Sequence, residues 1–186
     1  MSDPQAPSER LTRLFPNLAS SDWHRTSPED DRYQCIALAA CYTDKKWWPW
    51  DHTSFFWPPG FDRLQPPESV PVSYFTAMFG RHFGYCVCTS DKFEVGYQKI
   101  AIYTNADGVS HMARQHFFGR GWLSKIGDLV DIVHADLGDL EGSEYGTVAK
   151  IMRRSWWRAL RKGCVFRSLS AAFRFWLLRR GNNESN

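Results

Sequence analysis

The apolar stretches of the first half of the chain predict two helices separated by an irregular loop. A run that begins at Cys35 is Ala-rich and contains neither Gly nor Pro, which predicts a buried helix starting near that residue. A shorter helix is expected over Val72–Phe79, with Gly80 near its end. Between them, residues 45–71 are rich in proline, which forbids long regular structure, but they also carry many Trp and Phe side chains. We therefore expect a folded loop that packs aromatic rings over the domain.

The second half of the chain has the pattern of β-structure. Five strands are expected, and they span Phe83–Thr89, Tyr97–Thr104, His111–Phe117, Gly121–Ile126 and Val130–His134. The sequence Asn105-Ala106-Asp107-Gly108 predicts a hairpin turn between the second and third strands, because Asn, Asp and Gly accept the backbone angles of tight turns. From residue 147 onward, a mixed apolar and basic pattern predicts a long helical region that is broken or bent at Gly163.

These elements predict an α+β domain over residues 27–146, with the helix of Cys35 packed on a small antiparallel sheet. Residues 1–26 are expected to be flexible or loosely packed. Residues 147–180 are expected to form a basic, aromatic helical segment, and residues 181–186 a disordered tail. The length of 186 residues suits one such domain with an appended segment.

Composition narrows the class of protein. Aromatic residues make up 16% of the chain and include nine Trp, so even a small domain can fill its core. The chain starts with polar residues and contains no long uncharged apolar run, so we expect neither a signal peptide nor a transmembrane helix. Five cysteines without a secretory signal indicate reduced thiols in the cytoplasm, with export by a non-classical route left open. Cys86 and Cys88 lack the spacing of a zinc site, and we expect neither a metal nor an organic cofactor.

The charge of the chain is unevenly distributed. Residues 147–180 hold ten of the 23 Lys and Arg residues and none of the 20 acidic ones, so the remainder of the chain is net acidic. This segment could pack on the acidic body, or it could contact a protein partner or an anionic membrane surface. Nucleic acid is the weaker alternative among its partners.

Cys35 and His111 are the candidate catalytic pair. A thiol at a helix start lies beside unpaired backbone N–H groups, which stabilise a thiolate and can bind an oxyanion. His111 opens a predicted strand directly after a turn, where its imidazole could face a cleft and act as general base. The pair would attack a peptide or amide substrate.

The order of the Cys35 helix, the arm GYQKIAIYTNADG and the segment SHMARQ resembles the NlpC/P60 and CHAP types of papain-like cysteine hydrolase. The segments YQCIALAA and WWPW, and the series Ser124-Lys125, Gly127, His134 and Tyr145-Gly146, resemble motifs of the NCIAWA, WWP and SKxG type in a bacterial family. The likeness spans roughly residues 33–150. It implies a papain-like fold with Cys35 as nucleophile and His111 as base.

Other features depart from that pattern. Gln34 stands where Asn or Asp would be expected, and the residue that would orient the imidazole is not fixed by the sequence. Ser124, Gln115 and His134 are the three options. A hydrolase, with toxin, effector or processing roles open, therefore stands beside a second hypothesis, an inactive binding module that uses the basic segment. A catalytic Cys35 should react with a thiol probe ahead of the other cysteines.

Overall fold

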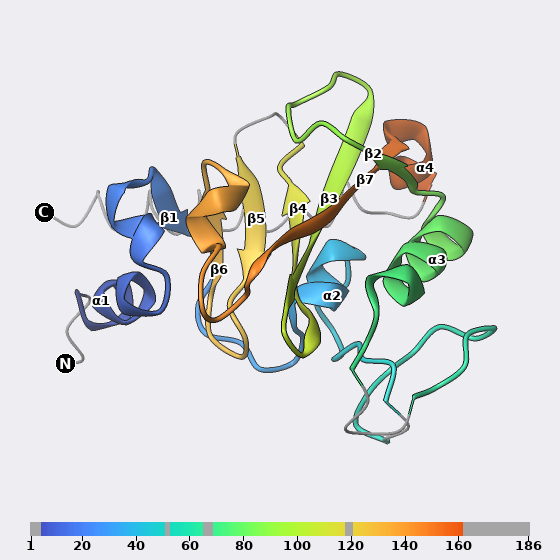
Figure 1. The fold of residues 1–186 in the computed structure, drawn as a ribbon, viewed down its shortest axis with the longest axis horizontal. Coiled ribbons are helices and arrows are strands. Elements are labelled where there is room, and N and C mark those ends of the chain that lie inside the picture. Colours follow the sequence, from blue (N-terminus) through green and yellow to red (C-terminus); the bar gives the residue numbers. More distant parts are fainter. Residues whose placement is uncertain (1–4, 51–52, 65–68, 118–120, 162–186) are drawn as a thin grey trace, which may run out of the picture.

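The protein is built around one antiparallel sheet (Figure 1). The computed structural model describes residues 5–50, 53–64, 69–117 and 121–161. In these ranges the sheet has seven strands in the order β1-β6-β5-β4-β3-β7-β2, and each of its strand pairs is antiparallel. The α+β class expected from the sequence is therefore confirmed.

The elements have the following bounds. The strands are β1 (Trp23–Arg25), β2 (Cys86–Cys88), β3 (Tyr97–Asn105), β4 (Gly108–Gln115), β5 (Trp122–Lys125), β6 (Asp131–His134) and β7 (Thr147–Ser155). The helices are α1 (Gln5–Leu14), α2 (Cys35–Ala39), α3 (Val72–Phe83) and α4 (Trp156–Arg161), with two short 3-10 helices, η1 (Pro16–Ser20) and η2 (Leu137–Leu140). Figure 1 shows α1 and β1 at one end of the sheet, and α3 and α4 at the other.

Two hydrophobic cores cover the two faces of the sheet. On β4, Met112 packs in a core with α2, α3 and the aromatic loop, and we call this side the α2 face. Its neighbour Ala113 packs in a second core with η1 and η2, on the side we call the η2 face. Successive residues of a strand point to opposite sides, so His111 shares the η2 face with Ala113.

The central hairpin agrees with its sequence signals. β3 and β4 pair from Ile100–Arg114 to Asn105–Gly108, and Gly108 adopts a φ of 105°, a conformation that favours glycine. The helix α2 begins at Cys35 as expected, although it has only five residues. Helix α3 runs past Gly80 to Phe83, and ends where Gly84 takes the left-handed conformation.

The described part of the N-terminal segment is packed from residue 11 onward, which corrects the expectation of a loosely packed or flexible segment there. Leu11, Phe15 and Leu18 are buried against the η2 face of the sheet. Their spacing places them on one side of the α1–η1 segment, where hydrophobic burial outweighs the polar composition around them. β1 then pairs with β6 and adds an edge to the sheet.

Residues 147–155 form a strand, which corrects the expected helix. β7 lies between β3 and β2, and Met152 and Arg154 point into the core of the α2 face. A short apolar and basic pattern fits either structure, and the free edge of β3 decides in favour of a strand. The predicted boundaries at 27 and 146 therefore do not delimit the sheet. Helix α4 follows, and the rest of the predicted basic helix, from residue 162, lies outside the described residues.

Candidate active site

Cys35 stands at the start of α2 and is 8% exposed. The first intrahelical hydrogen bond runs from the Leu38 N–H to the Gln34 carbonyl, so the N–H groups of Cys35 and Ile36 make no bond within the helix. These two N–H groups point to the Cys35 sulfur and act to lower its pKa. Gln34 fixes this corner, because its Nε2 donates to the Trp47 carbonyl at 2.7 Å and its Oε1 accepts the Trp47 N–H at 2.8 Å. The residue that departs from the expected Asn or Asp therefore ties α2 to the aromatic loop.

The thiol of Cys35 is neutral at physiological pH. Burial raises its pKa to about 11, although the N–H groups of Met112, Ile36 and Cys35 act in the opposite direction. The expectation that the helix start would lower this pKa is wrong. A helix of five residues offers few aligned peptide dipoles, and the cost of burying a thiolate exceeds what they supply.

His111 lies within β4, opposite Tyr103 on β3, and is 1% exposed. The expectation that it would open a strand and face a cleft is thus wrong. Its ring stacks on Tyr145 with 4.1 Å between centroids and meets the Tyr103 ring edge-on at 5.4 Å. Burial lowers the pKa of His111 well below 6.5, and the neighbouring His134 adds to this effect. The imidazole is therefore uncharged at neutral pH.

A chain of hydrogen bonds runs from His111 through Ser124 to His134. Nδ1 of His134 lies 2.8 Å from the Asp136 carbonyl, which can only accept, so this nitrogen is the donor. In a neutral His134, Nε2 then accepts the Ser124 hydroxyl at 2.9 Å. Ser124 Oγ in turn accepts the N–H of His111 Nε2 at 3.1 Å. Nδ1 of His111 is left as a bare lone pair, and it is buried with no hydrogen-bond partner.

The far end of this chain is anchored by an acidic residue. Asp139 Oδ2 lies 3.7 Å from His134 Nδ1, and its carboxylate also accepts from Ser21 at 2.6 Å and from the Asp136 N–H at 2.9 Å. Burial alone would raise the pKa of Asp139, but the hydrogen bonds from His134, Ser21 and Asp136 hold it below its usual value. His134, one of three options from the sequence, is thus a full member of the chain that holds His111.

Cys35 and His111 lie on opposite sides of the β4 main chain. The backbone N–H of Met112, the residue that follows His111, interacts with the Cys35 sulfur and acts to lower its pKa. The His111 side chain points to the opposite side of the strand, on the η2 face. Within the described ranges, no hydrogen bond joins Cys35 Sγ to His111. The pairing of β4 with β5 ends at Ala113–Ser124, so Met112 and His111 lie just beyond the paired stretch.

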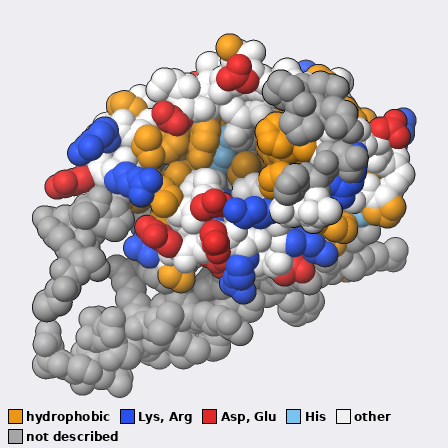
Figure 2. All heavy atoms as spheres, turned by 90° about the horizontal axis from the view of Figure 1, so that it is seen from below, with side chains coloured by type: hydrophobic (Ala, Val, Ile, Leu, Met, Phe, Trp, Pro, Cys, Tyr) orange, Lys and Arg blue, Asp and Glu red, His pale blue; other side chains and the backbone are white. Residues whose placement is uncertain are grey.

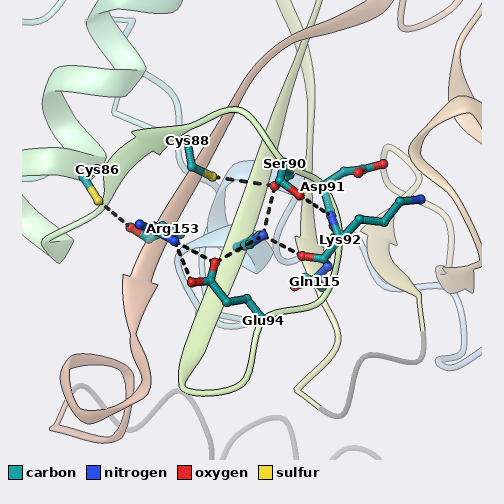
Figure 3. A network of polar contacts seen from close by, with 9 residues as sticks. Cys86, Cys88, Ser90, Asp91, Lys92, Glu94, Gln115 and Arg153 are labelled. Atoms are coloured by element: carbon teal, nitrogen blue, oxygen red, sulfur yellow. Dashed lines mark hydrogen bonds and ion pairs between the residues drawn. The ribbon is translucent and has the colours of Figure 1, made fainter.

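Gln115 does not orient the imidazole. It lies four residues along β4 from His111, roughly 13 Å away at the spacing of an extended strand, and its Nε2 donates to the Asp91 carbonyl at 2.8 Å. Figure 3 shows the group that it joins in the β2–β3 connection. There the buried Lys99 donates to the carbonyls of Ser90 and Lys92, so these polar side chains fasten a loop.

Sequence reasoning missed a buried charged cluster on the α2 face, beside the start of α2. Lys125 is fully buried, donates from Nζ to the Leu129 carbonyl and lies 4.9 Å from the centre of the Tyr33 ring. The Tyr33 hydroxyl donates to Asp131 at 2.7 Å. Burial lowers the pKa of Lys125 and raises that of Asp131. The only sequence signal was the position of Lys125 next to Ser124.

Other surface features carry less chemistry. A hollow of about 470 Å³ is lined by Pro28, Glu29, Asp30, Asp31, Arg32 and Asp128. Ion pairs join Asp30 to Arg32 at 2.6 Å and Asp128 to Lys46 at 2.8 Å, so part of this acidic charge is already balanced. Figure 2 shows basic and acidic side chains interspersed over the face seen from below, next to a group of hydrophobic ones.

The described part of the chain lacks two further classes of site. There, no group of three or more His, Cys, Asp or Glu side chains is placed to hold a metal ion. No helix in the same ranges combines the length and the apolar character needed to cross a bilayer.

The fold and site define an α+β domain with a helix-borne cysteine and a buried His–Ser–His chain. The family model described as "Domain of unknown function (DUF7689)" matches residues 24–153, and the chain belongs to this family. Neither a curated protein nor a solved structure matches the chain.

Proposed function

We propose that this domain is a papain-like cysteine hydrolase that cleaves an amide or peptide bond, with Cys35 as nucleophile and His111 as general base. The observation that carries the proposal is the bare, buried Nδ1 of His111. A general base needs one ring nitrogen held and the other free to take a proton, and Ser124 holds Nε2 at 3.1 Å. The Met112 N–H beside the Cys35 thiol belongs to the next residue of the same strand.

The reaction follows from these positions. The Cys35 proton passes to Nδ1 of His111 while sulfur bonds to the substrate carbonyl carbon, and the N–H groups of Cys35 and Ile36 are the donors nearest the developing oxyanion. The C–N bond then breaks, and the amine leaves with the proton from His111. Water, activated by the same nitrogen, hydrolyses the thioester and restores the thiol.

The neutral state of the thiol makes the base indispensable. With a pKa of about 11, Cys35 is ionised to only about one part in 10⁴ at neutral pH. A preformed thiolate is thus not the attacking species, and proton transfer must accompany attack. Ser124 and His134 act as positioning residues, because they keep the proton on Nε2 of His111 and off Nδ1.

The fold type, the substrate class and the biological role belong to the same proposal. A helix that begins with Cys35 and packs on an antiparallel sheet supports the papain-like lineage. The substrate is a peptide or amide. Toxin, effector and processing roles are each compatible with this chemistry.

The test is cleavage of a library of internally quenched peptides by the full chain. Wild type should release fluorescence, and Cys35→Ala should abolish it while circular dichroism shows an unchanged fold. Cys88→Ala is the matched control, because Cys88 lies in β2 away from α2 and its loss should leave the rate unchanged. Cleavage at the wild-type rate in Cys35→Ala would contradict the proposal.

A second candidate is favoured by one observation. The Trp157 side chain on α4 is 78% exposed, and it stands within the basic region of residues 147–180. Such a side chain could anchor the protein on a partner or an anionic membrane, with nucleic acid as the weaker alternative. Co-sedimentation with anionic vesicles should fall in Trp157→Ala, and equal sedimentation of both proteins would reject this contact.

A further inference from the structure

Cys41 occupies a backbone position that usually belongs to glycine. It follows α2 with a φ of 70°, and no other non-glycine residue in the described ranges has a positive φ. The Cys41 N–H donates to the Leu38 carbonyl and the Tyr42 N–H to the Ala37 carbonyl, which are the two bonds of a helix-ending motif whose left-handed residue is most often glycine. A side chain in this conformation costs about 1 kcal/mol relative to glycine. Cys41 therefore destabilises the fold locally compared with a glycine at the same position.

Two guanidinium groups converge on this sulfur. Arg114 Nη1 on β4 lies 2.7 Å from Cys41 Sγ, and Arg154 Nη2 on β7 lies 3.6 Å from it. Cys41 is 4% exposed, and both arginines are buried as well. Arginine only donates hydrogen bonds, so the sulfur must accept them, and a thiolate accepts far more strongly than a thiol.

Arg154 is fixed by contacts that do not involve the sulfur. Gln98 Oε1 accepts from Arg154 Nη2 at 2.7 Å and from the Tyr85 hydroxyl at 3.1 Å, and the Arg154 guanidinium lies 4.6 Å from the centre of the Tyr85 ring. The positive charge of Arg114 acts to lower the pKa of Asp131 on β6. The position of the Arg154 guanidinium therefore does not depend on where the thiol points, and Arg114 reaches the sulfur from the neighbouring part of the sheet on β4.

We propose that Cys41 is held as a thiolate between Arg114 and Arg154, and that it is the cysteine at which a hydroperoxide first oxidises this protein. The thiolate attacks the terminal oxygen of the peroxide, so that an S–O bond forms and the O–O bond breaks. Sulfur is oxidised by two electrons to a sulfenic acid. The peroxide is reduced and leaves as alkoxide or hydroxide, which takes a proton from water. The same guanidinium groups would then hold the ionised sulfenate.

This site differs from the thiols of Cys35 and Cys88. Burial raises the pKa of Cys35 and also that of Cys88, which keeps both as neutral thiols at physiological pH. Simple thiol probes should therefore react with Cys41 faster than with Cys35. A Cys35 activated by its helix would give the reverse order. The inference does not depend on hydrolysis, because it concerns another sulfur and another set of cations.

The first test is the ultraviolet absorbance of thiolate in the folded protein at neutral pH. Wild type should show a thiolate band that disappears in Cys41→Ser and weakens in Arg114→Gln, with fold checked by circular dichroism. Cys86→Ser, which removes an exposed thiol, and Cys35→Ala should both keep the band. A wild-type spectrum without the band, or a band unchanged in Cys41→Ser, would overturn the proposal.

The second test needs no variant. Wild-type protein is treated with hydrogen peroxide in the presence of dimedone, which traps sulfenic acids, and adducts are located by mass spectrometry. The Cys41 adduct should form at least about tenfold faster than the adduct at Cys35. Equal or faster trapping at Cys35 would contradict the assignment. Hydrolysis retained in Cys41→Ser would show that the two sulfurs act separately.

Discussion

Nε2 of His111 and Oγ of Ser124 lie 3.1 Å apart inside the core, between neighbouring strands β4 and β5. The same hydroxyl reaches His134 on β6 at 2.9 Å, so three adjacent strands each contribute one member of the chain. The chain holds the orientation of the His111 ring, and with a neutral His134 it places the His111 proton on Nε2. Buried polar groups joined in this way are costly to break, which makes the chain open to measurement.

Replacing Ser124 by Ala should destabilise the protein by about 2–4 kcal/mol, because ring nitrogens of His111 and His134 would lose their buried partner. Chemical denaturation gives the free energy of unfolding, and nitrogen chemical shifts report the tautomer of His111. Ser110→Ala is the control, since it removes a single bond from Oγ to the Tyr145 carbonyl. A Ser124→Ala protein as stable as Ser110→Ala would show that the chain does not stabilise the fold.

Acid should weaken the fold through His111. Its pKa in the folded state lies well below 6.5, so below that pH the unfolded chain binds a proton that the folded protein does not. This contribution to stability is present above pH 6.5 and is lost as the pH falls, by up to about 1.4 kcal/mol per pH unit. Unfolding free energies measured across this range should fall less steeply in His111→Gln than in wild type. Parallel curves would contradict a buried neutral imidazole.

Alkali should weaken the fold through Cys35. Its pKa rises from an ordinary 9.0 to about 11 on folding, so between these values the unfolded chain has lost a proton that the folded protein retains. The contribution is fully present below pH 9 and is lost as the pH approaches 11, with a total of about 2–3 kcal/mol. Cys35→Ala should lack this part of the decline. An identical alkaline slope in the variant would place the thiolate in a favourable environment instead.

Gly146 should not tolerate a side chain. It has a φ of 70°, and a Cβ would lie 1.9 Å from the Thr104 carbonyl oxygen. Gly146→Ala should cost about 2 kcal/mol or more and displace Tyr145 from the His111 ring, since these two residues are adjacent. Gly138→Ala, with nothing within 4 Å of the new Cβ, should change stability by less than about 0.5 kcal/mol. Equal stability of the two variants would contradict the tight approach of the chain at Gly146.

The elements that local signals specify could be predicted from the sequence. The β3–β4 hairpin follows from its Asn-Ala-Asp-Gly turn, and α2 begins at Cys35 because an apolar run free of Gly and Pro starts there. β7 could not be predicted, because Met152 and Arg154 fit a helix as well as a strand until β3 offers an edge. The packed N-terminal segment likewise depends on a sheet face that is assembled from distant strands.

The site shows the same division. Ser124 was among the candidates, and its distance from His111 in the chain suited a neighbouring strand. The raised pKa of Cys35 could not be predicted, because it depends on the core that closes over α2. The side of β4 on which His111 emerges depends on the register of the strand, which a shift of one residue would reverse.

The central claim is that Cys35 forms an acyl intermediate with His111 as its base. The most direct measurement is transfer of an acetyl group from p-nitrophenyl acetate, with the modified residue located by mass spectrometry on a millisecond-to-minute time course. We expect an acetyl thioester on Cys35 in wild type, formed about 10²–10⁴ times more slowly in His111→Ala. An acetyl group that never appears on Cys35, or one that appears there at the wild-type rate in His111→Ala, would contradict the claim.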